Sequence, residues 1–199
     1  MTNLGYREEV VKPAPIRVSD LRDGTAQWMG DTYRRLGGRL DTPPLRPGSW
    51  DLAFEGELLV ELDEELHFNR YRHLTLEPEW AANLPWRSKY SAYSVDREVD
   101  CLSAGKWGQR WTTSSSESLF GTADTPGTFL TSGAPRWKQR ALYDAMKDAL
   151  AAVGVVRLAR LSIYDAVNGV LLGAALNLKA RVDLEGLHHL IIDRVAPGL

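Results

Sequence analysis

The chain has 199 residues, 44% of them hydrophobic and 25% charged, with a formal net charge of -2. This length suits a single domain with a buried core. The near-neutral charge excludes a global field that attracts nucleic acid or membrane, so any basic binding surface must be local. The only cysteine, Cys101, excludes an intrachain disulfide and a CxxC zinc site. Residues 1–9 contain no apolar signal core, and no segment approaches a membrane span, so we expect a cytoplasmic protein.

The first predicted helix covers residues 26 to 36. Ala26, Met29, Tyr33 and Leu36 recur at helical spacing, and the following Gly37-Gly38 pair predicts the end of the helix. Residues 41–48 contain three prolines and a glycine, which favour a loop over a continued helix.

Residues 50 to 67 have the most informative pattern of the chain. Positions 50, 52, 54, 58, 60 and 62 are apolar, whereas positions 51, 55, 57, 61 and 63 are acidic. This alternation predicts a β-hairpin with one apolar and one acidic face. Because opposed residues share a face, the loop must have an odd number of residues, and Glu55-Gly56-Glu57 meets this condition. That register places Asp51 opposite Glu61, with Asp63 alongside.

Opposed carboxylates on a sheet repel each other, so the acidic face needs compensation. A divalent hard cation would provide it, because Mg²⁺ prefers oxygen ligands. The alternative is a solvated face whose carboxylates are simply hydrated. His67, near the end of the second strand, fits either a structural hydrogen bond or a role in proton transfer.

The remaining elements follow from periodicity and turn signals. Residues 68–90 give no confident element, and residues 91–134 suggest an insertion or a strand with long loops. Pro135 opens the clearest helix, which ends before Gly154. A strand over 155–164, a turn at Asn168-Gly169, a strand over 170–178 and a helix capped by Asp183 complete the prediction.

At the acidic hairpin the sequence resembles the PD-(D/E)xK nuclease superfamily, particularly its very-short-patch-repair-like branch. Asp51 stands for the first motif aspartate, Glu61-Leu62-Asp63 matches E-x-D, and His67 has the spacing of the branch's histidine. A second block agrees in order: residues 136–140, a helix through Asp144 and Lys147-Asp148, then Gly154 and the strand 155–158. The resemblance implies a mixed α/β (α+β) fold with a restriction-endonuclease-like core, a central mixed β-sheet flanked by helices, in one nuclease-like domain over residues 1–199.

The resemblance also implies a Mg²⁺ (or Mn²⁺)-dependent endonuclease that hydrolyses phosphodiester bonds of nucleic acid, with DNA favoured over RNA and no membrane partner. The implied metal ligands are Asp51, Glu61, the Leu62 carbonyl and Asp63, with His67 assisting proton transfer. Asp31 on the first helix is a further acidic candidate. The expected phosphate contacts are Arg70, Arg72, Arg136, Lys138, Arg140 and Arg157, together with Arg160.

Two other functions stay open at this point. Glu64 stands where the branch has glycine, and the overall charge is near neutral, while the replacement of the superfamily's lysine by Asp63 is shared with the branch. A catalytically inactive nuclease-like module that binds nucleic acid or protein is therefore one alternative. Another is a different metal-assisted hydrolase that uses the same carboxylates.

Overall fold

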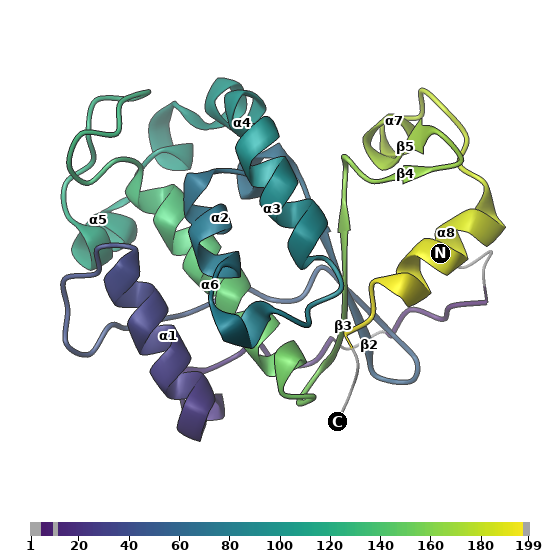
Figure 1. Ribbon diagram of the computed structural model, residues 1–199, viewed down its shortest axis with the longest axis horizontal. Coiled ribbons are helices and arrows are strands. Elements are labelled where there is room, and N and C mark those ends of the chain that lie inside the picture. The colour runs from purple at the N-terminus through teal and green to yellow at the C-terminus, as the bar shows by residue number, and fades with distance from the viewer. Residues whose placement is uncertain (1–4, 10–11, 197–199) are drawn as a thin grey trace.

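The computed structural model describes residues 5–9 and 12–196, and a small mixed sheet lies at its centre (Figure 1). Strand β1 covers Leu52–Phe54, β2 covers Leu58–Asp63 and β3 covers Arg157–Ser162. Their order is β1-β2-β3, with β1 antiparallel and β3 parallel to β2. The predicted mixed sheet flanked by helices is therefore confirmed, and the nuclease core remains a prediction.

The hairpin has the predicted register. Leu52 pairs with Val60 and Phe54 with Leu58, which leaves a loop of three residues, Glu55-Gly56-Glu57. Gly56 and Glu57 both adopt positive φ angles, of 77° and 60°. Extension of the same pairing by one residue places Asp51 opposite Glu61.

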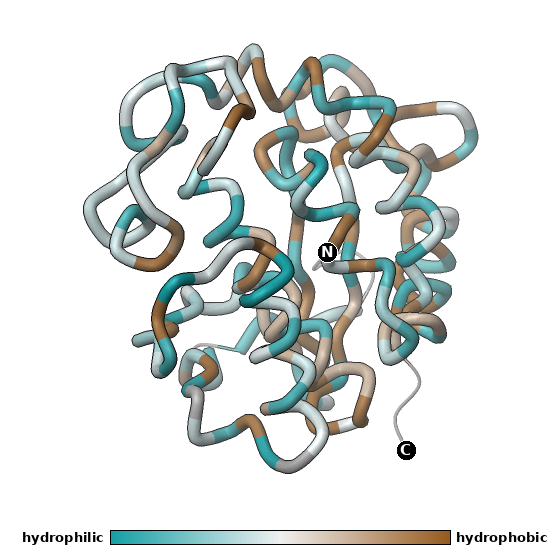
Figure 2. The backbone as a smooth tube through the Cα atoms, turned by 60° about the vertical axis from the view of Figure 1, so that its left-hand side comes forward, coloured by the Kyte–Doolittle hydropathy of each residue, from teal (hydrophilic) through white to brown (hydrophobic). Residues whose placement is uncertain are grey.

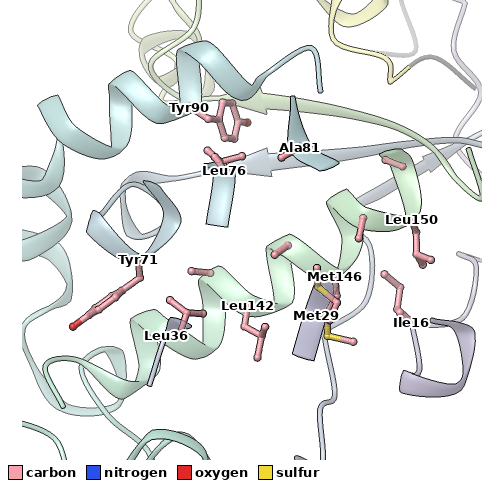
Figure 3. Packing of buried hydrophobic residues seen from close by; sticks show 14 of the residues in the cluster. Ile16, Met29, Leu36, Tyr71, Leu76, Ala81, Tyr90, Leu142, Met146 and Leu150 are labelled. Carbon is pink, nitrogen blue, oxygen red and sulfur yellow. The ribbon is translucent and has the colours of Figure 1, made fainter. Parts of the chain in front are cut away.

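Helix α6, Pro135–Ala152, is the central helix of the molecule. Pro135 occupies its first turn, and Gly154 follows its end with a φ of 69°, as the sequence predicts. Helices α1 (Asp23–Arg35), α2 (Arg70–Leu76) and α5 (Ser114–Phe120) pack against it. Figure 3 shows Leu142, Met146 and Leu150 among the packed apolar side chains of this layer. Most residues of α6 are thus buried, including several charged ones.

The sheet is covered on both faces. Ala53, Leu59 and Leu158 belong to the core shared with α6. Phe54, Val60 and Leu161 belong to a second cluster with Ile191 of helix α8, Leu184–Asp193. Residues 7–9 run beside β1, and residues 195–196 run beside β3, so both sheet edges are also paired in part.

The segment that we could not interpret from the sequence is helical. It contains α2, α3 (Arg87–Asp96), α4 (Glu98–Gly105) and α5, with short 3-10 turns over Glu79–Ala81 and Gly108–Arg110. The suggested strand is wrong, because the structure describes no strand between residues 91 and 134. Side-chain caps explain two of these short helices: Asn69 accepts hydrogen bonds at the start of α2, and Thr113 at the start of α5. Cys101, Trp111 and Phe120 from this segment join the main core.

The C-terminal predictions hold in part. Asn168 and Gly169, both with positive φ, join the short strands β4 (Ala166–Val167) and β5 (Val170–Leu171). The predicted strand over 170–178 ends early because Leu172–Leu176 forms helix α7, in line with the helix propensity of its Leu and Ala residues. Asp183 caps α8 by accepting a hydrogen bond from the Gly186 amide at 2.8 Å.

Hydrophobic and hydrophilic residues alternate along the chain trace at short intervals (Figure 2). Within residues 5–9 and 12–196, none of the helices combines the length and the apolar character that a membrane crossing requires.

Candidate active site

A cleft of about 690 Å³ lies between the open end of the β1–β2 hairpin and helix α6. Both carboxylates and cations line it. The acidic residues that line it are Asp51, Glu61, Glu64 and Asp144, and the basic ones are Lys12, Arg136, Arg140 and Lys147, with His67 and Tyr143 beside them. The cleft therefore joins the two sequence blocks on which the nuclease resemblance rests.

Asp51 and Glu61 meet across the hairpin as the register requires. The Asp51 amide donates a hydrogen bond to Glu61 Oε1 at 3.2 Å, and the Leu62 amide donates to Asp51 Oδ2 at 2.9 Å. Asp51 is exposed, whereas Glu61 is only 3% exposed. The hydrated acidic face considered above is therefore wrong for Glu61, whose charge needs a partner inside the protein.

Lys147 of α6 is that partner. Its Nζ lies 2.7 Å from Glu61 Oε2 and donates a second hydrogen bond to the Ser49 carbonyl at 3.0 Å. Burial nevertheless raises the pKa of the Glu61 carboxyl, and the nearby charges of Arg160 and Lys147 only partly oppose this. A further cation in the cleft would favour the ionised form of Glu61.

Asp63 lies beneath the cleft and does not line it. Both of its oxygens accept hydrogen bonds from Arg160 Nη1, at 3.0 and 2.8 Å. Burial alone would raise the pKa of Asp63, but the charges of Arg160, His67 and Arg72 together outweigh burial and the pKa is lowered. Arg160 also binds Asp148 at 2.6 Å, and Asp148 lies 2.7 Å from Arg72. The expected role of Asp63 as a metal ligand beside Asp51 is therefore not supported, because Arg160 occupies its carboxylate.

His67 connects this buried network to the cleft. Its Nδ1 lies 2.8 Å from Asp144 Oδ2 and 3.1 Å from Asp63 Oδ1. Burial lowers the pKa of the imidazole, but Asp144 and Asp63 outweigh burial and the pKa is raised. These three residues also present ligand atoms within 4.8 Å of one another, so they form a second group that could hold a metal. The guanidinium of Arg160, which also lies 3.4 Å from Asp144, competes for their carboxylates.

The structure brings two of the expected phosphate contacts to the cleft. Arg136 and Arg140 lie one turn apart on α6, and both line it. Arg140 also donates to the Leu66 carbonyl at 3.2 Å, which holds its side chain along the cleft wall.

The other expected phosphate contacts lie elsewhere. Arg72 and Arg160 are fully buried in ion pairs, so neither can reach a phosphate. Lys138 is buried near the rings of Tyr71 and Phe120. Arg70 is paired with Glu98 at 2.7 Å, and Arg157 is exposed at the far end of β3 beside the Gly56 carbonyl. Asp31 is likewise outside the cleft and pairs with Arg34 on the surface of α1.

Sequence reasoning assigned no site role to Lys147, Asp144 or Lys12. Arg140, Asp144 and Lys147 recur at i, i+4 and i+7, which is the spacing of one helix face. On its own this spacing also fits an ordinary solvated face. The signal that distinguishes it is that most other positions from 141 to 152 are apolar, which favours a helix buried on several sides, with the charged stripe against another charged element.

A family model matches residues 31–178, which include the hairpin, α6 and β3. The chain belongs to a family of unknown function, DUF7255. The matched part of the DUF7255 chain contains Asp51, Glu61, Lys147 and nearly all of the cleft. No curated protein and no solved structure matches the chain.

Proposed function

We propose that this protein is a divalent-metal-dependent nuclease that hydrolyses phosphodiester bonds of nucleic acid, with DNA favoured as substrate. One observation carries the proposal: Asp51 and Glu61 face each other in a cleft, with Lys147 bound to Glu61 at 2.7 Å. The arginines of α6 that line the same cleft supply cations for a phosphate backbone.

The oxygen atoms at the hairpin fit a hard cation. Lys147 occupies Oε2 of Glu61, while Oε1 lies on the side of Asp51. Asp51, Glu61 and the Leu62 carbonyl would hold Mg²⁺ or Mn²⁺, since both metals favour oxygen ligands. When bound, the metal would lower the pKa of a coordinated water and stabilise negative charge on the phosphate.

Lys147 supplies the positive charge that the motif lysine provides in the superfamily, where this chain has Asp63. The superfamily's motif lysine is absent from β2, but Lys147 reaches the Glu61 carboxylate from α6 instead. Its ammonium group favours the ionised form of Glu61 and would add a positive charge beside the reacting phosphate.

His67 is suited to donate a proton. Asp144 and Asp63 engage Nδ1, which leaves Nε2 for proton exchange, and His67 lines the cleft. The two carboxylates raise the pKa of His67, which favours the protonated imidazole. We assign it the role of general acid toward the leaving oxygen.

A nucleic-acid-binding module without catalysis is the second candidate. The observation that favours it is the Lys147–Glu61 ion pair, which compensates the buried carboxylate without a metal. Such a module would bind nucleic acid equally well with Mg²⁺ and with EDTA.

Plasmid cleavage tests the proposal. The wild type should cleave in Mg²⁺ and not in EDTA, while Asp51→Ala and Glu61→Ala should lose cleavage. Asp31→Ala is the matched control, since Asp31 is an exposed acid outside the cleft. Cleavage that survives in folded Asp51→Ala and Glu61→Ala proteins would overturn the assignment.

A further inference from the structure

A second, smaller pocket adjoins the cleft. It has a volume of about 260 Å³ and is lined by polar residues from three parts of the chain: Arg46, Ser115, Ser118, Arg136, Gln139 and Tyr143. Arg136 and Tyr143 also line the cleft, so the two hollows share a wall on α6.

The two hollows differ in charge. Four carboxylates and four cations line the cleft, whereas the described residues that line the smaller pocket include two arginines and no carboxylate. Arg46, Ser115 and Ser118 are exposed, and Arg136 is half-buried. The smaller pocket therefore offers guanidinium donors and the Ser115 hydroxyl to an anion, next to the cleft that we propose to hold a metal.

Three cations on α6 follow one line between the two hollows. Lys147 lies beside Glu61, Arg140 lies two turns nearer the N-terminus of α6, and Arg136 lies one turn further. At a rise of about 1.5 Å per residue, the distance from Lys147 to Arg136 is about 16 Å along the helix. This corresponds to several nucleotides of one strand at about 3.4 Å per phosphate.

We infer that the smaller pocket is a second phosphate subsite, which holds a phosphate of the same nucleic-acid strand a few nucleotides from the scissile one. This inference rests on the proposed function, because the strand would enter the pocket from the cleft. Arg46 and Arg136 would bind the phosphate, and the exposed Ser115 hydroxyl would donate a hydrogen bond to it.

Arg46 is the residue that tests the subsite with the least disturbance of the fold. Its backbone amide, and not its guanidinium, donates the hydrogen bond to Tyr143 Oη at 3.3 Å. Arg46→Ala keeps that bond and removes only the exposed side chain. The control is Arg181→Ala, an exposed arginine in the segment between α7 and α8, on the other side of β3 (Figure 1).

The experiment measures binding of a fluorescent eight-nucleotide single-stranded DNA by anisotropy, in EDTA and over a series of salt concentrations. EDTA prevents metal-dependent cleavage, so the signal reports contacts of the protein with the strand. Arg46→Ala should weaken binding several-fold and reduce the slope of log K against log salt by about 0.7, the value for one lost contact with a single strand. Arg46→Lys should retain most of the slope, and Arg181→Ala should match the wild type.

Equal slopes for Arg46→Ala and Arg181→Ala would overturn the subsite, as would a wild type that does not bind the strand in low salt. Failure of the nuclease proposal is visible separately. If the wild type never cleaves in Mg²⁺ but Arg46→Ala still lowers the slope, the subsite stands as part of a binding module. If cleavage is intact and the slope is unchanged, only the subsite is wrong.

Discussion

Each buried carboxylate at or beneath the cleft is paired with at least one cationic side chain. Glu61 has Lys147, Asp63 has Arg160, and Asp148 has both Arg72 and Arg160. Removing one partner of a buried pair leaves an uncompensated charge, which costs more than the pair itself contributes. We therefore expect replacements at exposed residues of the cleft to leave the free energy of unfolding nearly unchanged, and replacements at the buried ones to lower it.

His67 gives a prediction for pH. Its folded pKa is raised, so its ion pairs stabilise the protein fully below the unfolded-state pKa of about 6.5. That contribution is lost as the pH rises through the folded-state pKa. In EDTA, the free energy of unfolding should fall across this range in the wild type and stay flatter in His67→Gln.

An NMR titration should also show a pKa above about 6.5 for His67, and a lower one in Asp144→Asn. A His67 pKa that is unchanged in Asp144→Asn would contradict this account.

Lys147 gives a prediction for catalysis. Lys147→Met replaces the side chain by an unbranched, uncharged one that lacks the terminal ammonium group. Loss of one preorganised charge of this kind lowers kcat by about 10²–10³-fold. The check is the cleavage rate at saturating Mg²⁺, with the thermal unfolding midpoint as the folding control. A Lys147→Met enzyme with the kcat of the wild type would remove Lys147 from the mechanism.

The hairpin is the element whose sequence determined its geometry most completely. Period-2 alternation fixes the face of each residue, and the requirement that even positions oppose even positions fixes the loop length. The structure has this register. The alternation could not reveal that α6 covers the face of the hairpin that carries Glu61 and Asp63. The cations that compensate these carboxylates come from residues about 90 positions further along the chain.

The loop gives a direct test of that register. Deletion of Gly56 would leave a two-residue loop, which forces one strand to turn its buried face outward. We expect the deletion variant to lose cooperative thermal unfolding. Glu57→Gly, at a position with a φ of 60°, should be tolerated or slightly stabilising because glycine adopts this conformation without strain. A stable Gly56 deletion with wild-type activity would show that the register does not matter.

Strand β3 offers a matched pair of arginines. Arg160 is fully buried between Asp63 and Asp148, while Arg157, three residues earlier, is exposed. Arg160→Leu should reduce the free energy of unfolding by about 3–5 kcal/mol, because it leaves buried carboxylates unpaired. Arg157→Leu should change it by less than about 0.5 kcal/mol. Urea unfolding of both variants checks this, and similar losses would contradict the assigned network.

At the scale of the whole molecule, long periodic elements were predictable and short capped ones were not. Helices α1, α6 and α8 carry clear apolar spacing and stop signals. The helices between residues 70 and 120 are short and depend on caps and on contacts with the core, so propensity alone does not reveal them. The same holds for the candidate site: Asp51, Glu61 and His67 were named from local pattern, whereas Lys147 entered only through the packing of α6 on the sheet.

The central claim is that Asp51 and Glu61 bind a divalent cation. Isothermal titration with Mn²⁺ tests it most directly, using the wild type, Asp51→Asn, Glu61→Gln and the control Asp31→Asn. We predict binding in the wild type and in Asp31→Asn, and its loss in the other two variants. Binding that is unchanged in Asp51→Asn and Glu61→Gln, but lost in His67→Gln, would move the metal to the Asp63–His67–Asp144 group and contradict the proposed site.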